Sequence, residues 1–288
     1  MNQLSAMKWR LGAPQSSLRN AAVSLGSLAV AVVLAANAAP AAAGQLAAPA
    51  ELADKGTITY CATLDNPPRA NYDTERRPVG FEVELGTEIA ARMGLEVNWV
   101  QLKFVGLIPA LQAQQCDALM QELFIKPSRL EIIEMVPFSR TGQRIVAPKD
   151  NAETVDSLEA LSGKKLAVPN GTTIHNLANE ANEKLKAEGK PEINLVVLPT
   201  TTETFHQLAT GQVEYVGTTT TAASYYVGLR PEAFRLEGQP FGLILTGIGI
   251  RKGNEELVSA IQASLDSIMA DGTYTKLIEK WNMQGSEL

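Results

Sequence analysis

Short runs of β-forming residues alternate with amphipathic helical stretches along most of the chain, and this alternation is the strongest constraint on the fold. In the first cycle, TITYCAT at 57–63 is typical of a strand, and FEVELGTEIAARMG places Phe81, Leu85 and Ile89 on one helical face before Gly94. Such cycles are typical of a parallel-type sheet covered by helices. We therefore predict an α/β fold.

The cycles fall into two sets with an excursion between them. A chain of 288 residues that is 45% hydrophobic can bury two moderate cores. We expect two lobes, each with a parallel-type sheet, joined by two hinge crossings near 140–146 and 242–247, an arrangement that permits a cleft to close. The predicted ranges are 44–142 for the first part of lobe 1, 143–243 for lobe 2 and 244–288 for the return strand and C-terminal helices of lobe 1.

Residues 1–43 are predicted to be a cleavable signal peptide. Three basic residues precede an Ala/Val/Leu-rich run over about 21–36, and the small residues of ANAAPAAAGQ follow it, with a cleavage site expected near Ala43. An uncleaved membrane anchor is the alternative. The apolar run is short for a span and Pro40 closes it, which favours export.

The charge of the chain argues against a nucleic-acid partner. The formal net charge is −6, and it becomes −9 once Lys8, Arg10 and Arg19 are removed with the signal, which carries no acid. Nucleic-acid binding depends on Lys and Arg to neutralise phosphates. An acidic chain is instead suited to staying soluble after export.

Cysteine usage leaves one question open, and the histidines predict no metal site. Cys61 and Cys116 are the only cysteines, and in an oxidising compartment they either form one disulfide or are two small buried residues. Cys61 comes late in one predicted strand and Cys116 just before another, an offset that argues against the bond. His175 and His206 are isolated from both thiols and from each other, so no metal-ligand set is predicted.

Five segments of the chain match the pattern of a known family. PVGFEVELGTEIAARMG, GLIPALQAQQCDALM, PSR, SLEALSGKKLAVPNGTT and MADGTYTKLIEKWN resemble, in order and spacing, the extracellular solute-binding protein family 3, the periplasmic receptors of polar-amino-acid ABC importers. The likeness extends from about Gly56 to the end of the chain. It implies a two-lobed periplasmic binding protein of type II (Venus-flytrap-like), a monomer without a cofactor. Such a protein closes its cleft around a small-molecule carboxylate ligand and docks to an inner-membrane ABC permease.

The resemblance also assigns carboxylate-binding residues. Arg129, in KPSR, occupies the position of the family's arginine that binds the ligand's α-carboxylate, a task that suits a planar guanidinium fork. Gly171 and Thr172, in PNGTT, match the loop that offers backbone N–H groups and a hydroxyl to the same carboxylate at a helix N-terminus. The alternatives are a surface arginine and ordinary N-capping by Thr172 or Thr173.

The chain departs from the family pattern where the amino group of a ligand would bind. Thr63, in CAT, and Thr219, in the strand-to-helix corner VEYVGTTTTAASYY, stand where family members commonly have aspartates. Asn66 and Arg69 replace two aromatic residues. The family's Ser-Gly-Met-Thr run is replaced by Gln121, Glu122, Leu123 and Phe124.

These departures predict an unusual ligand. A buried ammonium without a carboxylate partner is costly. We expect a ligand that keeps a carboxylate for Arg129 and either lacks a free α-ammonium or presents it to Glu122 or Asp65. Arg69 is either a second cation in the cleft or a solvated loop residue. Phe104 either floors the site or packs in the core.

The favoured function is a transport receptor without catalytic residues. One alternative is an enzyme on the same scaffold, similar to periplasmic cyclohexadienyl dehydratases, with Glu122 as a general acid. A second alternative is a soluble ligand-sensing partner of a membrane receptor. The sequence does not name the ligand or its affinity, and it does not tell a permease partner from a sensor.

Overall fold

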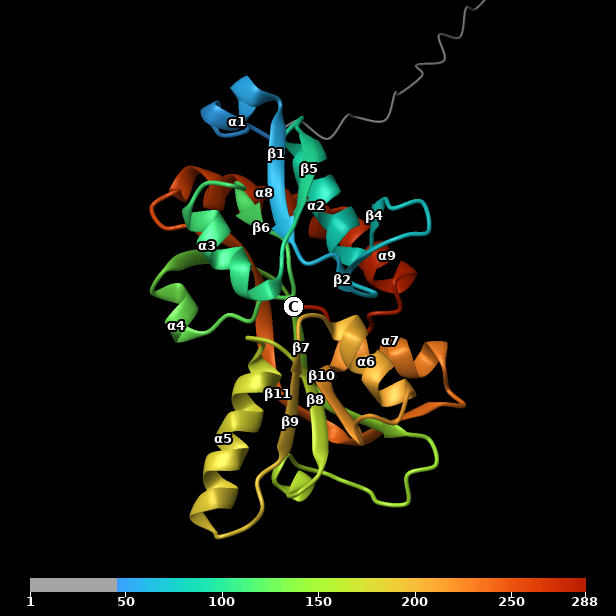
Figure 1. The fold of residues 1–288 in the computed structure, drawn as a ribbon. Coiled ribbons are helices and arrows are strands. Elements are labelled where there is room, and N and C mark those ends of the chain that lie inside the picture. Colours follow the sequence, from blue (N-terminus) through green and yellow to red (C-terminus); the bar gives the residue numbers. More distant parts are fainter. Residues whose placement is uncertain (1–45) are drawn as a thin grey trace, which may run out of the picture. The chain divides into compact units, whose positions relative to one another are not determined.

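The computed structural model describes residues 46–288, which form an α/β fold (Figure 1). The predicted signal peptide, residues 1–43, lies outside the described residues. Among residues 46–288, no helix is long and apolar enough to cross a membrane.

Helices and strands alternate along the described chain as the sequence predicts. The α-helices are α1 (Ala50–Lys55), α2 (Phe81–Arg92), α3 (Leu107–Gln112), α4 (Pro127–Leu130), α5 (Thr173–Ala187), α6 (Thr201–Ala209), α7 (Thr220–Leu229), α8 (Glu255–Ala270) and α9 (Thr273–Lys280), with short 3-10 helices η1 (Phe104–Gly106) and η2 (Glu159–Leu161). The strands are β1 (Thr57–Ala62), β2 (Asp65–Asn66), β3 (Ala70–Tyr72), β4 (Pro78–Val79), β5 (Glu96–Gln101), β6 (Ala118–Leu119), β7 (Ile133–Pro148), β8 (Lys165–Pro169), β9 (Asn194–Leu198), β10 (Tyr215–Thr219) and β11 (Phe234–Arg251).

One sheet runs through both lobes, with the strand order β5-β1-β6-β11-β7-β10-β8-β9. Its centre is the long antiparallel pair β7 and β11, which include the crossings predicted near 140–146 and 242–247. On one side of this pair β1 is parallel to β5 and β6, and on the other side β8 is parallel to β9 and β10. We call the part with β1, β5 and β6 lobe 1 and the part with β8, β9 and β10 lobe 2. The two parallel sets and the two shared strands confirm the predicted fold class.

Helices cover both faces of lobe 1, with α2, α8 and α9 on one face and α3 on the other (Figure 1). The apolar face predicted for α2 is fully buried, and its Phe81 and Ile89 pack in one core with Ile261 of α8 and Ile278 of α9. Gly94 follows the helix at φ 68°, in the left-handed region that glycine adopts without a steric penalty, and the helix ends there as predicted.

In lobe 2, α5 packs on one face of the strands, and α6 and α7 pack on the other (Figure 1). Ile174 of α5 joins Val168 of β8 in the first core, and Phe205 of α6 joins Ala223 of α7 in the second. The N-termini of these three helices follow the ends of β8, β9 and β10. The carboxyl ends of parallel strands are the usual place for ligands in open α/β sheets.

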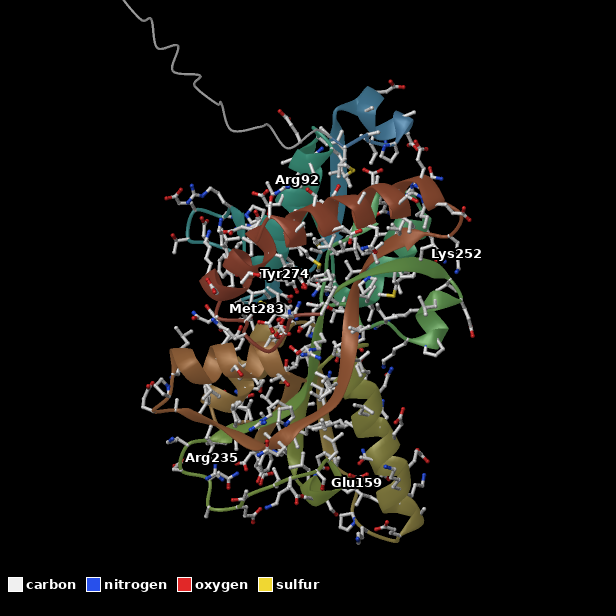
Figure 2. All side chains as sticks on the ribbon, turned by 180° about the vertical axis from the view of Figure 1, so that it is seen from behind. Arg92, Glu159, Arg235, Lys252, Tyr274 and Met283 are labelled. Carbon is white, nitrogen blue, oxygen red and sulfur yellow. A yellow bond between two sulfur atoms is a disulfide. The ribbon has the colours of Figure 1, made fainter. Side chains whose placement is uncertain are left out.

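The C-terminal segment returns to the hinge. The Tyr274 hydroxyl of α9 donates a hydrogen bond to the Phe138 carbonyl of β7 at 2.7 Å, and Met283 is buried in the lobe 1 core (Figure 2). The Arg140 N–H donates to the Ser286 carbonyl at 2.9 Å. The last residues of the chain therefore stabilise one of the two strands that join the lobes.

Cys61 and Cys116 form a disulfide, with their Cα atoms 5.8 Å apart. The offset that argued against this bond was misleading. Strands β1 and β6 are neighbours in the sheet, with Cys61 opposite Leu119, but Cys116 lies in the loop before β6 and outside the ladder. Strand register therefore does not set its distance from Cys61, and the loop brings the two thiols together.

Candidate functional site

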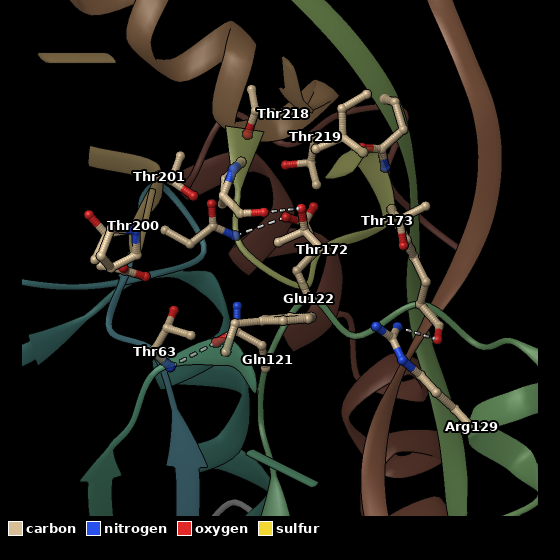
Figure 3. Close-up of a pocket in the computed structure, with 18 residues that line it drawn as sticks. Thr63, Gln121, Glu122, Arg129, Thr172, Thr173, Thr200, Thr201, Thr218 and Thr219 are labelled. Carbon is tan, nitrogen blue, oxygen red and sulfur yellow. Dashed lines mark hydrogen bonds between the residues drawn. The ribbon is translucent and has the colours of Figure 1, made fainter. Parts of the chain in front are cut away.

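A cavity between the two lobes is lined by 18 residues (Figure 3). Lobe 1 contributes the end of β1, the strand β2, η1, the segment 121–124 and α4, whereas lobe 2 contributes three strand-to-helix loops at 169–174, 199–201 and 218–219. In the close-up, Arg129 lies at one end of the cavity, and Thr63, Thr200 and Thr201 lie at the other (Figure 3).

Nine of the eleven residues predicted from the sequence line this cavity: Thr63, Asn66, Phe104, Gln121, Glu122, Phe124, Arg129, Thr172 and Thr219. Arg69 and Gly171 do not. Asp65, expected from the sequence as a possible partner for a ligand's ammonium, also lines the cavity, and the structure adds Gln143, Pro169, Thr173, Ile174, Pro199, Thr200, Thr201 and Thr218. Pro199 ends the strand-forming run INLVVLP at 193–199, and Thr200 and Thr201 directly follow it, so the usual position of ligands at the carboxyl ends of strands was a signal for these three residues. Gln143 gave no such signal, because it lies within a long strand.

Arg129 is a partly buried cation at one end of the cavity. Its Nη1 donates to the Phe124 carbonyl at 2.8 Å, and its guanidinium lies 5.6 Å from the centre of the Phe104 ring. No carboxylate among residues 46–288 pairs with it. Burial lowers the pKa of Arg129 to about 10, so it still carries its charge at neutral pH. Phe104 is half-buried and lies both against this arginine and in the cavity wall.

Threonines dominate the lobe 2 side, where three helices begin. Thr172, Thr200 and Thr219 are the N-cap residues of α5, α6 and α7. The hydroxyls of Thr200 and Thr219 cap their helices, accepting hydrogen bonds from backbone N–H groups at 3.1 and 3.4 Å. The Thr172 hydroxyl instead donates to the Pro169 carbonyl at 2.7 Å, so the alternative of side-chain capping by Thr172 is wrong. Backbone N–H groups at the start of α5 are therefore left for another partner.

Gly171 lies where a side chain would collide with the opposite lobe. Its N–H donates to Nδ1 of His175 at 3.1 Å and not into the cavity. Its φ is 71°, and a Cβ at this position would lie 2.5 Å from Cγ1 of Val105, which belongs to lobe 1. The glycine thus permits a close approach of the two lobes.

Glu122 lines the cavity but is already paired. Its Oε1 lies 2.6 Å from Nε of Arg69 and accepts a hydrogen bond from the Thr221 hydroxyl at 2.5 Å, and its Oε2 accepts from Nδ2 of Asn66 at 2.9 Å. A carboxylate with these partners is not available to a ligand's ammonium.

Arg69 is neither a cleft cation nor a solvated loop residue, because it is completely buried. Its Nη1 lies 3.1 Å from Oε1 of Glu82 and donates to the Ser139 hydroxyl at 3.0 Å. Burial raises the pKa of Glu82 to about 7, although Arg69 opposes this shift. Both expectations for Arg69 fail because two carboxylates, Glu82 and Glu122, surround it in the interior.

Asp65 is the lining carboxylate that has no cationic partner among residues 46–288. Burial raises its pKa to about 6. A positively charged group in the cavity would offset the free-energy cost of burying this carboxylate.

Buried neutral groups also face the cavity without a partner. They are the hydroxyls of Thr63 and Thr173 and both amide atoms of Gln143, and none of these atoms has a hydrogen-bond partner within the described part of the chain. Buried polar side chains are normally hydrogen-bonded. The cavity therefore has unused hydrogen-bonding capacity that is mostly neutral.

Comparisons with known proteins agree with this geometry. The family of bacterial extracellular solute-binding proteins, family 3, matches residues 58–284. The lysine/arginine/ornithine-binding periplasmic protein of Escherichia coli (strain K12) is 30% identical over 249 residues, which cover 83% of this chain and 91% of that protein.

Two solved structures extend the likeness to the fold. An ancestral arginine-binding protein bound to arginine has a TM-score of 0.72 at 32% identity and covers 78% of this chain and 98% of its own. The ancestral amino acid-binding protein AncCDT-1, a precursor of cyclohexadienyl dehydratase, has a TM-score of 0.73 at 30% identity and covers 80% and 97%. Since sequence and fold both agree over most of its length, this chain belongs to the bacterial extracellular solute-binding proteins, family 3.

Proposed function

We propose that this protein is a periplasmic solute-binding receptor of an ABC importer, which captures a polar amino acid or a small carboxylate derived from one. The observation that carries the proposal is Arg129, a partly buried cation without a carboxylate partner in the described residues, at the end of a cavity that both lobes line. Of the related proteins named above, one is a lysine/arginine/ornithine-binding protein and another is an arginine-binding protein with arginine bound.

The ligand's carboxylate would lie between Arg129 and the start of α5. The guanidinium offers a planar fork of donors that matches a carboxylate. The N-terminus of α5, at Thr172 and Thr173, lines the same cavity from the other lobe, and a helix N-terminus favours an anion. One anionic group would thus contact both lobes.

Contacts to both lobes supply the free energy for closure. A ligand shifts the equilibrium toward the closed arrangement only when it binds that arrangement more tightly than the open one. A carboxylate held by Arg129 of lobe 1 and α5 of lobe 2 meets this condition. The closed form would then dock to the permease.

The test is a thermal-shift screen followed by calorimetry. The screen uses amino acids, their N-modified derivatives and small di- and keto-acids, because a ligand that binds only the folded state raises the melting temperature. For any hit, Arg129→Ala should weaken binding by at least about 2 kcal/mol, or about 30-fold. Arg76→Ala, at an exposed arginine that does not line the cavity, is the matched control and should bind normally. Unchanged affinity in Arg129→Ala would remove Arg129 from the site.

A transport role also predicts a cellular phenotype. Cells that lack the protein should lose uptake of the identified ligand at low concentration, and uptake should return with the intact protein but not with Arg129→Ala. Normal uptake together with a lost response to the ligand would identify a sensory partner instead of a permease.

Elimination chemistry is a second candidate, because AncCDT-1 is a precursor of a dehydratase. Such a reaction needs a general acid beside the leaving group. Glu122 is already ion-paired with Arg69 at 2.6 Å, whereas Asp65, with its pKa raised to about 6 by burial, has no cationic partner among residues 46–288 and is the better candidate. Turnover of any ligand that is lost in Asp65→Asn but not in Glu122→Gln would favour the enzyme.

A further inference from the structure

Gln143 is a buried amide in the cavity wall, and it has no protein partner. It lies in β7, one of the two strands that join the lobes, and is 1% exposed. Neither its Oε1 nor its Nε2 has a hydrogen-bond partner among residues 46–288, although the side chain lines the cavity. An unpaired buried amide loses the solvation of a donor and an acceptor, so it indicates a partner that enters the cavity.

One of the two neighbours of Gln143 in the sheet is Thr219, at one of the positions where the family commonly has an acid. The two residues are directly opposite in the antiparallel pair of β7 and β10, so their side chains lie on the same face. The Thr219 hydroxyl already accepts from the Ala222 N–H at 3.4 Å and lies 3.2 Å from the Thr221 hydroxyl. The helix cap therefore uses Thr219, and Gln143 keeps its full hydrogen-bonding capacity.

Glu122, the lobe 1 acid that is linked to this region through Thr221, does not supply a free negative charge. Glu122 is held by Arg69 and by the hydroxyl of Thr221, the second residue after Thr219. Gln143 and Thr219 offer only neutral acceptors to an ammonium, and an ammonium bound to them would leave Nε2 of Gln143 without an acceptor. Burial of a charge under these conditions is unfavourable.

We propose that Gln143, beside Thr219, forms a subsite for an uncharged planar group that presents one hydrogen-bond donor next to one acceptor, such as a primary carboxamide or a ureido group. The carbonyl of such a group accepts from Nε2 and its N–H donates to Oε1, so both orphan atoms are paired at once. The ligand is then an amino-acid derivative whose amino group is carbamoylated or otherwise neutral, and not a free α-amino acid. This inference rests on the proposed function, because it takes the ligand's carboxylate to lie at Arg129.

The first experiment compares matched ligands on the unmodified protein. The probes are L-alanine, L-norleucine and L-lysine, each as the free amino acid, the Nα-acetyl derivative and the Nα-carbamoyl derivative, and the measurement is isothermal titration calorimetry. We expect the N-carbamoyl form to bind at least about tenfold more tightly than the free form, as for one or two hydrogen bonds to a buried group. The N-acetyl form should lie between them, because its trans amide cannot pair with both atoms of Gln143.

Two substitutions then locate the preference at Gln143. Gln143→Met keeps the length of the side chain without its polar atoms and should weaken the N-carbamoyl form about tenfold or more, with little effect on the free form. Gln143→Glu supplies an anion and should shift the preference about tenfold or more toward the free amino acid. Gln212→Glu makes the same charge change at an exposed position outside the cavity and should change neither.

The outcomes separate the subsite from the proposed function. Arg129-dependent binding of free amino acids at least as tight as that of their N-carbamoyl forms would overturn the subsite and leave the receptor function in place. The same holds if both Gln143 variants bind every probe as the unmodified protein does. If no member of either series binds, or if Arg129→Ala has no effect on those that do, the proposed function fails, and the subsite fails with it.

Discussion

Lobe 1 contains two arginines whose surroundings are opposite. Arg69 is completely buried, lies within 3.1 Å of two carboxylates and donates to the Ser139 hydroxyl. Arg129 is partly exposed to the cavity, and within residues 46–288 its guanidinium makes one hydrogen bond, to the carbonyl of Phe124, while an aromatic ring lies against it.

The two arginines differ because lobe 1 pairs Arg69 with its own carboxylates and leaves Arg129 available to a ligand. Around Arg69 the protein supplies the counter-charges, and Glu122, which would otherwise face the ligand, is drawn into the same network. Around Arg129 no carboxylate of residues 46–288 supplies a counter-charge, so a ligand can supply it. A charge that is already paired contributes little to binding, because a ligand would first have to break the existing contacts.

The largest expected effect is on stability when Arg69 is removed. Arg69→Met leaves Glu82 and Glu122 buried without their cation, and we expect the free energy of unfolding to fall by about 3–5 kcal/mol. Arg129→Met removes no ion pair within residues 46–288 and should change the same quantity by less than about 1 kcal/mol. Urea denaturation monitored by circular dichroism measures both. Equal losses in the two variants would contradict the comparison.

Glu82 should make stability depend on pH. Its pKa is raised by burial from an ordinary 4.5 to about 7, so between these values the folded state binds more protons than the unfolded state. The free energy of unfolding therefore falls as pH rises from about 4.5 to about 7, by as much as about 3 kcal/mol from this group.

Denaturation at a series of pH values checks this expectation. Glu82→Gln should flatten the pH dependence, and Glu88→Gln, at a more exposed carboxylate of the same helix, should not. Asp65, whose pKa is raised to about 6, contributes in the same direction and should leave a smaller residual slope in Glu82→Gln. Identical slopes in the unmodified protein and in Glu82→Gln would show that Arg69 keeps Glu82 charged.

Thr221 connects the two regions, because it donates from lobe 2 to Glu122 of lobe 1 at 2.5 Å. Thr221→Val removes a hydrogen bond to a charged group. We expect the closed arrangement to lose about 2 kcal/mol of stability relative to the open one, which is measured as weaker ligand binding. Thr220→Val is the matched control, because the Thr220 hydroxyl has no partner in the described chain. Equal binding by the two variants would mean that the contact does not support closure.

The smallest effect concerns Asp65. A ligand with a cationic side chain should place it near this carboxylate, and its affinity should fall by up to about tenfold as pH is lowered from 7 to 5, since protonation removes the charge of Asp65. Asp65→Asn should abolish this pH dependence and leave ligands with neutral side chains unaffected. Nα-carbamoyl-L-lysine and N-carbamoyl-L-norleucine are the matched pair for calorimetry. If the affinities of both change with pH in the same way, the cationic side chain does not lie near Asp65.

Much of the cavity wall was predictable because its residues follow short motifs. The matches KPSR and PNGTT indicated Arg129 and Thr172, and both line the cavity. The same reasoning failed for Arg69, because a loop position says nothing about two acids that approach from α2 and from the segment after β6. It also missed Gln143, since a polar residue inside a long strand looks ordinary until the partners of its amide atoms are known.

The sequence by itself determined the α/β alternation, the family and the position of Arg129, because periodicity and local motifs depend on residues close together in the chain. Only the tertiary structure decided that Arg69 neutralises Glu122, that Cys61 bonds to Cys116 and that Gln143 faces the cavity unpaired. Glu122 lies 53 positions after Arg69, and the two cysteines are 55 apart. Which side chains pair, which are buried and which polar atoms stay without a partner depends on distances in space. Strand order and loop paths determine those distances, and spacing along the chain does not encode them.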